Sequence, residues 1–369
     1  MSVARTIRRP APRHAAALVT AGILKVVAVI PAHNEQEQIA EAIGSLLAQR
    51  LRPARIVVIA DNCTDATAEI AARYPVEVVT TVGNRHRKAG ALNQVLEALL
   101  PTLDPWDAVL VMDADSVLDP GFIKAAVRHL ADPGVPAVGG TFAGKPGGGL
   151  VGALQRNEYA RYARDLRRRQ GKTLVLTGTA TLFRAHVLDE VLRARRAGVL
   201  RGGPAVYDTQ VLTEDNELTL AIRHLGHRII APPECTLLTE VMPTWADLFR
   251  QRLRWKRGAI ENLKAYGWTP VTREYWARQL LAVVGLFALT AYLVSLVWAA
   301  VTGGFHFNPL WTGVTAVIAL ERIVTVRSRG PAMMALAGLL IVEMAFDIHL
   351  QAAQAKAFWD TLRNTERTW

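Results

Sequence analysis

The 369-residue sequence predicts an α/β fold, in which a largely parallel sheet with helices on both faces is followed by hydrophobic helices that associate with a membrane. Short apolar runs alternate with amphipathic stretches from residue 26 to about residue 140, which is the pattern of βαβ units. A run of 23 uncharged residues, 279–301, follows in the last hundred residues. The chain is 51% hydrophobic and only 20% charged, whereas soluble domains carry about 25% charged residues. This composition excludes a disordered, collagen-like or disulfide-stapled protein.

The strands and helices of the sheet region alternate regularly. The predicted strands are short, rich in β-branched residues and bounded by turns: VVAVI (26–30), RIVVIA (55–60), VEVVT (76–80) and AVLVMD (108–113). Amphipathic helices are predicted between them at 37–49, 65–74 and 88–100. Because ligands bind at the carboxyl ends of such strands, we expect the chemistry in the loops that follow them.

The chain divides into three predicted regions. Residues 1–24 are basic and rich in Pro and Ala. A basic arm is favoured there over a signal peptide, because Lys25 ends the apolar run just ahead of the first strand. A globular domain is predicted over 25–270 and a membrane-associated helical region over 271–369. Within the globular domain, the further predicted elements are a glycine-rich loop at 144–149, helices at 151–170 and 245–263, and a strand-like segment at 173–184.

The run 279–301 meets the length of about 20 residues that a helix needs to cross a bilayer. Few core helices stay apolar on all sides for this length. Two weaker segments, 309–326 and 331–350, are interrupted by charges. Either both cross the membrane with Arg322 neutralised by Glu343, which we favour, or they lie along its surface. In the crossing arrangement the flanking basic residues face the cytoplasm.

The net charge of +11 suits nucleic acid, an anionic membrane face or a phosphate-bearing substrate. The sequence holds no nucleic-acid recognition motif, and its arginines are scattered or flank hydrophobic runs, so we expect no nucleic-acid partner. Cys63 and Cys235 form no CxxC pair. Their spacing fits a reducing compartment and argues against structural zinc.

Polar residues follow three of the predicted strands. Asp113 and Asp115 end the fourth strand, and alternate strand residues point to one face, so both carboxylates can reach one divalent cation. Asp61 follows the second strand, too early to cap the next helix, and is expected to accept hydrogen bonds from a ligand. His33 follows the first strand, but no second His or Cys has metal-ligand spacing with it.

Two further motifs lie in the second half of the chain. Glu214 and Asp215 precede an amphipathic helix, where a capping role alone would explain an acid. Gln251, Arg254 and Trp255 fall at i, i+3 and i+4 of a predicted helix and therefore share a face. A guanidinium binds phosphate oxygens and an indole stacks on a sugar ring. An arginine snorkelling at a membrane surface fits the same pattern equally well.

Taken together, these residues resemble the processive-synthase branch of the family 2 glycosyltransferases, which includes cellulose, chitin, hyaluronan and poly-N-acetylglucosamine synthases. The resemblance covers about residues 26–265. It rests on motifs in the right order: PAHNE (31–35), Asp61, NRHRKAGALN (84–93), DAD (113–115), TED (213–215) and QRLRW (251–255). It implies a GT-A fold, in which a nucleotide-binding sheet is joined to an acceptor-binding half.

The resemblance implies a nucleotide-sugar site at the ends of the strands. Pro31, His33 and Glu35 belong to the loop that would line the nucleotide pocket. Asp61 would hydrogen-bond the uracil, and Lys88 would lie near the nucleotide.

The family pattern also implies a metal ion, Mg²⁺ or Mn²⁺, at the DAD motif. Asp113 would contact the donor and help to bind the metal, and Asp115 would be its principal ligand. The metal would neutralise the leaving diphosphate, a task that Arg254 would share.

The catalytic and acceptor residues are implied in the same way. Asp215 would be the general base, with Glu214 beside it in the motif. Asn93 would fix the loop that carries Lys88. The residues implied to bind the acceptor are Thr177, Gly178, Gln251 and Trp255. Glu158 and Tyr159 would face the same groove.

The implied activity is inverting, metal-dependent transfer of a sugar from a nucleotide sugar, with UDP expected, to a hydroxyl of a glycan or lipid-linked acceptor. The catalytic domain is expected at the cytoplasmic face of the membrane, in contact with lipids. The branch usually carries membrane helices before the catalytic domain as well. Here only 24 residues precede the first strand and at most three helices follow, so a polymer channel would require oligomers.

Two alternative functions stay open at this point. One is a polyprenyl-phosphate sugar transferase, which the QRLRW motif argues against, whereas the C-terminal helices and the expected lack of N-terminal spans argue for it. The other is a non-catalytic, membrane-bound nucleotide-binding module, which the presence of Asp215 and of the DAD motif argues against.

Overall fold

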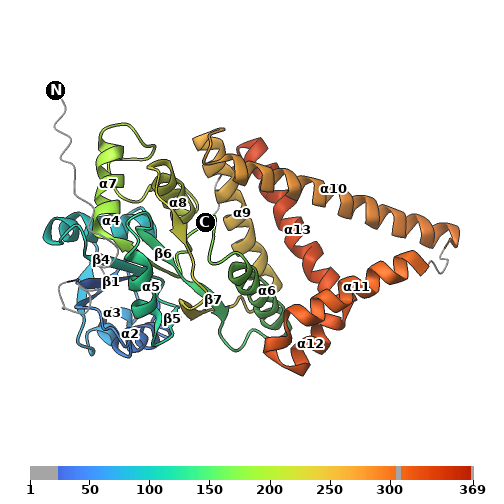
Figure 1. Ribbon diagram of the computed structural model, residues 1–369, viewed down its shortest axis with the longest axis horizontal. Helices are drawn as coiled ribbons and strands as arrows, with labels where there is room; N and C mark the ends of the chain where they lie inside the picture. The colour runs from blue at the N-terminus through green and yellow to red at the C-terminus, as the bar shows by residue number, and fades with distance from the viewer. Residues whose placement is uncertain (1–23, 305–308, 367–369) are drawn as a thin grey trace. The chain divides into compact units, whose positions relative to one another are not determined.

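The computed structural model describes residues 24–304 and 309–366 (Figure 1). The basic arm predicted at 1–24 therefore lies outside the described residues, except for Leu24. By packing, the chain divides into two units. Unit 1 comprises the residues up to 143 together with 166–210 and 214–240, and unit 2 comprises 144–165, 211–213 and 241–369. The boundary expected at residue 270, between a globular domain and a membrane-associated helical region, stays a prediction.

Unit 1 is built on a seven-stranded sheet of order β3-β2-β1-β4-β8-β6-β9 (Figure 1). Its strands are β1 (Val26–Ala32), β2 (Arg55–Ala60), β3 (Glu77–Thr80), β4 (Ala108–Met112), β6 (Ala137–Gly139), β8 (Ala180–Arg184) and β9 (Ile229–Ile230). The four predicted strands form the parallel half, in which β1 pairs with both β2 and β4. The strand β8 runs antiparallel to β4 and β6, so the sheet is mixed.

Helices cover both faces of this sheet. The helices of unit 1 are α2 (Ile39–Leu47), α3 (Thr67–Ala71), α4 (Arg87–Leu99), α5 (Phe122–Leu130), α7 (Ala185–Arg196) and α8 (Glu214–His224). Alternate residues of β1 enter two separate cores. Ala28 and Ile30 pack in the core that includes α2 and α5, whereas Val27 and Val29 pack in the core that includes α4, α7 and α8. This alternation is what the sequence predicts for a strand buried on both sides.

A smaller three-stranded sheet has the order β5-β10-β7, from β5 (Val117–Leu118), β10 (Thr236–Thr239) and β7 (Thr141–Gly144). The strand-like segment predicted at 173–184 is extended only over β8, its last five residues. The preceding residues form a loop because their hydrogen bonds go to side chains and turns: Leu176 N donates to Thr219 Oγ1, and Thr177 O accepts from Thr181 Oγ1.

Unit 2 is helical. It contains most of α6 (Gly149–Arg168), together with α9 (Trp245–Tyr266), α10 (Arg273–Thr302), α11 (Pro309–Thr325), α12 (Pro331–Gly338) and α13 (Leu340–Arg363). The helices α9 and α13 pack along each other. Val151, Leu154, Leu248 and Phe346 form the buried core that joins α6, α9 and α13.

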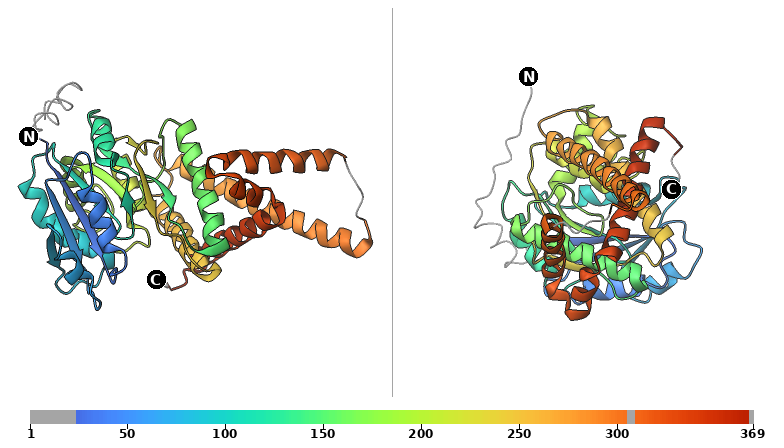
Figure 2. Two further views of the ribbon diagram at one scale, coloured as in Figure 1. Left: turned by 90° about the horizontal axis from the view of Figure 1, so that it is seen from below. Right: turned by 90° about the vertical axis from the view of Figure 1, so that its right-hand side faces the viewer.

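The last helices carry the apolar surface that the sequence predicts. Figure 2 shows α10 and α11 projecting beyond the other helices of unit 2. Among the described residues, α10 is the one single helix long and apolar enough to cross a membrane, and none of its most apolar window is buried. Its exposed side chains include Phe287 and Trp298, each 71% exposed. The helices α12 and α13 together meet the same criteria only as a pair bent by 74°.

The charges in these helices form ion pairs within unit 2. The predicted pair is present, since Arg322 Nη1 lies 3.0 Å from Glu343 Oε2. Arg322 also reaches Asp347 at 2.6 Å, and Arg161 of α6 binds the second oxygen of Glu343 at 2.8 Å. Glu343 is 3% exposed, so these two arginines compensate a carboxylate that is almost fully desolvated.

Candidate active site

The parallel strands β1, β2 and β4 end at one edge of the sheet, and polar residues follow each of them. Pro31 still belongs to β1 and is buried. His33 comes just after it, and its Nδ1 lies 2.6 Å from the backbone oxygen of Asp61. Since a carbonyl oxygen can only accept a hydrogen bond, Nδ1 carries the proton. The His33 ring therefore links the segment after β1 to the segment after β2 by a hydrogen bond.

Asp61 is almost fully buried, at 5% exposed. Its Oδ1 accepts hydrogen bonds from Thr81 Oγ1 and from Asn84 Nδ2, both at 2.8 Å, and from Asn62 Nδ2 at 3.1 Å. The adjacent Asn62 and two residues further along the chain therefore supply three donors to this oxygen, while the expected role of Asp61 toward a ligand stays a prediction. Its Oδ2 accepts no hydrogen bond from the described residues. Among the described residues, only Oδ1 of this carboxylate is engaged in hydrogen bonds.

The NRHRKAGALN motif contributes Asn84 to this arrangement. Asn84 also donates to the backbone oxygen of Arg87, at the start of α4. A Cβ on Gly90 would collide with Asn84 Oδ1. The close approach of the Asn84 side chain therefore requires a glycine at position 90. Sequence spacing alone singled out neither Asn84 nor Gly90.

The DAD motif lies in a turn rather than on the strand. The strand β4 ends at Met112, and Ser116 N donates to Asp113 O at 3.2 Å. The predicted geometry, with both carboxylates on one face of a strand, is therefore wrong, since the chain turns at this point. Asp115 Oδ1 accepts from Ser116 Oγ at 3.1 Å and from Thr239 Oγ1 at 3.4 Å.

A group of acidic side chains surrounds the DAD turn. Burial, and then the carboxylates of Asp115 and Glu240, raise the pKa of Glu35 to about 7. This local excess of negative charge and the hard oxygen donors suit Mg²⁺ or Mn²⁺. No group of three or more His, Cys, Asp or Glu residues with metal-binding geometry occurs among the described residues. Mg²⁺ does not require one, because it binds one or two carboxylates and takes further oxygens from substrate phosphates.

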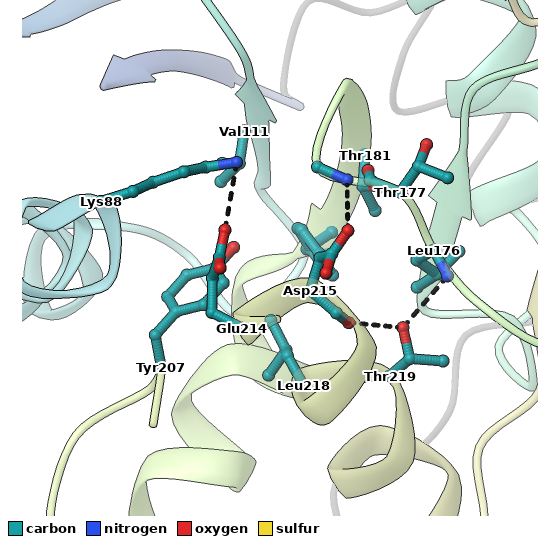
Figure 3. Close-up of a pocket in the computed structure, with 12 residues that line it drawn as sticks. Lys88, Val111, Leu176, Thr177, Thr181, Tyr207, Glu214, Asp215, Leu218 and Thr219 are labelled. Carbon is teal, nitrogen blue, oxygen red and sulfur yellow. Dashed lines mark hydrogen bonds and ion pairs between the residues drawn. The ribbon is translucent and has the colours of Figure 1, made fainter. Parts of the chain in front are cut away.

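Lys88 of α4 connects two of the predicted site motifs. Figure 3 shows its ion pair with Glu214. Lys88 Nζ lies 2.5 Å from Asp113 Oδ1 and 3.3 Å from Glu214 Oε1. Burial disfavours the charge of Lys88, but the Asp113 and Glu214 carboxylates outweigh it and hold the pKa of Lys88 above its ordinary value. The lysine is therefore a permanent cation between carboxylates from two distant segments.

Asp215 lies in the first turn of α8, and both of its carboxylate oxygens accept backbone hydrogen bonds. Gly178 N donates to Oδ2 at 2.9 Å, and Asn216 N donates to Oδ1 at 2.7 Å. Burial, and then the Glu214 carboxylate, raise the pKa of Asp215 to about 6, against the opposing charge of Lys88. A carboxylate with a pKa this close to neutrality is suited to accept a proton.

Gly178 allows this close packing. An ideal Cβ at this position would lie 2.6 Å from Lys88 Nζ. The neighbouring Thr177 lines the same small cavity, with its Oγ1 2.8 Å from that of Thr179. The structure thus brings together Lys88, Asp113 and Asp215 with the predicted acceptor segment.

Tyr207 also lines this cavity and was not predicted. Asn93 positions it through two backbone hydrogen bonds of 2.8 Å, one donated to Tyr207 O and one accepted from Tyr207 N. Asn93 therefore does fix a loop, but the loop is the one that carries Tyr207. A single tyrosine in a polar segment offers no sequence signal for such a contact.

The QRLRW residues belong to unit 2. They lie on α9, and their placement on one helix confirms the predicted element. Arg254 is exposed and makes no hydrogen bond or ion pair with a described residue. Gln251 Oε1 accepts from Arg252 Nη1 at 2.9 Å. Trp255 is 37% exposed.

Arg252, which was not predicted, organises this part of α9. Its guanidinium lies 4.5 Å from the ring centroid of Trp255 and 5.7 Å from that of Tyr159. It also pairs with Glu158 at 2.7 Å. The motif residue Trp255 and the α6 residues Glu158 and Tyr159 therefore meet around one buried arginine.

Comparison with known proteins identifies related sequences. A family model described as "Glycosyltransferase like family 2" matches residues 25–258, more than half of the chain. The poly-beta-1,6-N-acetyl-D-glucosamine synthase of Staphylococcus aureus (strain COL) is 25% identical over 280 residues, which is 72% of this chain and 63% of the relative. The enzyme of the same name from Staphylococcus epidermidis is 24% identical over 286 residues, 74% of this chain and 65% of the relative. The chain thus spans less than two thirds of these relatives' length.

A solved structure shares the fold. The mannosyltransferase PcManGT from Pyrobaculum calidifontis, in complex with GDP-Man and Mn²⁺, superposes with a TM-score of 0.60. The two proteins are 20% identical, and the match covers 93% of this chain and 88% of PcManGT. The similarity supports the GT-A-like arrangement of a mixed sheet followed by long apolar helices.

Proposed function

Because this chain belongs to glycosyltransferase family 2 and is therefore a nucleotide-sugar glycosyltransferase, we propose that it is an inverting, metal-dependent enzyme. It moves a sugar from a nucleotide sugar, with UDP the expected nucleotide, to a hydroxyl of a glycan or lipid-linked acceptor. The observation that carries this proposal is the Asp215 carboxylate, held by Gly178 N and Asn216 N beside the Lys88–Asp113 pair. This cluster supports a mechanism in which a base acts beside a charged residue of the donor side.

Asp215 acts as the general base. It accepts the proton of the acceptor hydroxyl while that oxygen attacks the anomeric carbon of the donor sugar and the bond to the diphosphate breaks. One displacement inverts the anomeric centre, so an α-linked donor yields a β-glycoside. Glu214 and Lys88 flank the base: Glu214 raises the pKa of Asp215 and Lys88 lowers it. These two opposing charges, together with burial, keep the pKa of Asp215 at about 6.

The donor site is assigned to the strand ends of unit 1. Asp61 Oδ2 is the oxygen available to the uracil, and His33 and Glu35 lie in the loop beside it. Asp115, with help from Asp113, would hold Mg²⁺ or Mn²⁺, which when bound neutralises the diphosphate of the donor. PcManGT was solved with GDP-Man and Mn²⁺, which supports this assignment for a protein of the same fold.

Acceptor binding is assigned to Thr177 and Gly178 in unit 1 and to Gln251 and Trp255 on α9. One face of Trp255 stacks on Arg252, and a pyranose ring can stack on the exposed remainder of the indole. Arg254, which is exposed and unpaired among the described residues, is assigned to the donor diphosphate.

The cytoplasmic side of a membrane is the proposed place of the catalytic residues, and attachment to that membrane is supported by the apolar, unburied helix α10. This helix also favours one second candidate, a transferase whose acceptor is a polyprenyl phosphate. That reaction joins the sugar to a phosphate oxygen rather than to a hydroxyl, and its product is extracted into organic solvent.

The proposal is tested with the full chain purified in detergent. UDP-glucose, UDP-N-acetylglucosamine, UDP-galactose and GDP-mannose are supplied with Mn²⁺ or Mg²⁺, and nucleotide release and product size are followed. Asp215→Asn is expected to lower kcat by about 10²–10⁴-fold, whereas Asp165→Asn, an exposed acid on α6, leaves it unchanged. Full activity of Asp215→Asn, or turnover unaffected by EDTA, would refute the mechanism. Retained activity with a product soluble in organic solvent would favour the polyprenyl-phosphate transferase.

A further inference from the structure

A second cavity of unit 1 lies at the opposite end of β4 from the DAD turn. Its volume is about 620 Å³, which is within the range of sites for small molecules. Trp106 lines it two residues before β4 begins, whereas Asp113 follows the last residue of β4. At about 3.3 Å per residue this places about 20 Å between the two residues. The cavity is therefore separate from the cluster around Lys88 and Asp215.

One face of α7 and a row of rings form its walls. His186, Glu190 and Ala194 recur at four-residue spacing along α7 and line the cavity. The ring of Trp106 is tilted by 59° against His186 with centroids 5.4 Å apart, and His227 meets the other side of the row at 6.4 Å from His186. Pro105, Pro133 and Leu225 add apolar surface. The walls thus combine flat rings with a few polar atoms.

Several of these polar atoms are available to a ligand. His186 Nδ1 lies 3.1 Å from Pro105 O, which can only accept, so Nδ1 holds the proton. Burial lowers the pKa of His186, so at neutral pH its Nε2 presents a lone pair. His227 Nε2 lies 2.8 Å from Glu190 Oε2. The Nε2 of His186 and the second oxygen of Glu190 accept no hydrogen bond from the described residues.

The charges of the cavity exclude three classes of ligand. The described residues offer no three-residue metal-binding group there. Arg193 is already paired with Asp189 at 2.6 Å. A hydrogen bond from His227 holds the pKa of Glu190 below its ordinary value. Among the described residues that line the cavity, a phosphate would therefore meet an ionised carboxylate and no unpaired cation. A purely apolar ligand would desolvate the Glu190 carboxylate and the His186 ring without replacing their hydrogen bonds.

We propose that this cavity binds a sugar unit of a glycan, at a site remote from the transfer centre. A pyranose ring presents an apolar C–H face to Trp106, while its hydroxyls donate to Glu190 and to His186 Nε2. A neutral ring with many hydroxyls satisfies both the apolar and the polar parts of the wall. That the glycan is the acceptor or product of this enzyme rests on the proposed function, whereas the binding itself does not depend on transfer.

The test measures binding without any donor present. Chitotriose, cellotriose and mannotriose are titrated into the full chain in detergent, and contacts are followed by saturation-transfer NMR and calorimetry. Trp106→Ala is expected to weaken binding of the preferred trisaccharide by about tenfold, and Glu190→Gln to weaken it as well. Ala194→Trp fills the cavity and is expected to abolish binding. The matched control is Trp268→Ala, which removes a tryptophan of unit 2 that is 76% exposed.

The outcomes separate this inference from the proposed function. The inference predicts that the three cavity variants keep the melting temperature and the kcat of the wild type. Their KM for a long acceptor is expected to rise, whereas their KM for a monosaccharide acceptor is expected to stay unchanged. If no trisaccharide binds, or if all variants bind as the wild type does, the inference is wrong even when transfer activity is normal. Displacement of the trisaccharide by inorganic phosphate would also overturn it. Binding that persists in a chain without transfer activity would sustain the inference and refute the proposed function.

Discussion

Replacing Lys88 by Met is expected to move the pH dependence of transfer to higher pH. Lys88 Nζ is paired with Asp113 and Glu214, and its positive charge lowers the pKa of Asp215. Met keeps most of the length of the side chain and removes the charge. The ionised, proton-accepting form of Asp215 then requires a higher pH, so activity at neutral pH falls.

The size of the shift follows from the geometry. An ideal Cβ on Gly178 would lie 2.6 Å from Lys88 Nζ and 3.6 Å from Asp215 Oδ2, which bounds the separation of these two atoms at about 6 Å. At an effective dielectric constant of about 20, unit charges at this distance interact by about 3 kcal/mol, equivalent to about two pKa units. The Lys88 side chain is 28% exposed, and screening by water reduces the expected shift to about one unit. The acid limb, expected near pH 6 in the wild type, then lies near pH 7.

The assay is nucleotide release from the preferred donor, measured as kcat/KM from pH 5 to pH 9. Lys88→Arg keeps the positive charge and is expected to keep the acid limb of the wild type. Lys124→Met, which removes an exposed lysine of α5, is the control for loss of charge elsewhere. An acid limb that stays in place or moves to lower pH in Lys88→Met would show that Asp215 is not the titrating base, or that Lys88 does not act on it.

Three further changes test other parts of the structure. Gly178→Ala places a Cβ 2.6 Å from Lys88 Nζ and is expected to lower kcat about tenfold or more. The control Gly121→Ala adds a Cβ with no atom within 4 Å and is expected to leave kcat unchanged. Equal activity of the two variants would argue against tight packing at Gly178. Arg322→Met leaves the buried Glu343 carboxylate with one arginine instead of two. The melting temperature in detergent is therefore expected to fall by several degrees, corresponding to a loss of about 3 kcal/mol in the free energy of unfolding. An unchanged melting curve would contradict the compensation of Glu343 by both arginines. Asp115→Asn is expected to raise the Mn²⁺ concentration needed for half-maximal activity by at least about tenfold, and an unchanged metal titration would remove Asp115 from the metal site.

Much of the fold is determined by local patterns. The apolar runs that became β1 to β4 and the helices between them could be predicted, because alternation of buried strands and amphipathic helices is a property of neighbouring residues. The uncharged segment that became α10 was equally clear, because hydrophobic length needs no tertiary context. The pairing of Arg322 with Glu343 followed from the cost of leaving a charge unpaired in apolar surroundings.

The arrangement of the candidate site depends on the tertiary structure. The motifs showed which residue types are present, but only the fold brings Lys88 between Asp113 and Glu214, and only the turn after β4 sets the separation of the two DAD carboxylates. Two of the three donors to one oxygen of Asp61, Thr81 and Asn84, lie 20 and 23 residues further along the chain.

Sequence patterns missed the residues whose contacts depend on distant segments. Tyr207 and the cavity beside Trp106 lie outside every motif, and Arg252 lies inside QRLRW without having been given a role there. The physical reason is that secondary structure depends on residues a few positions apart, whereas hydrogen bonds, ion pairs and cavities depend on which distant segments the packed core brings into contact.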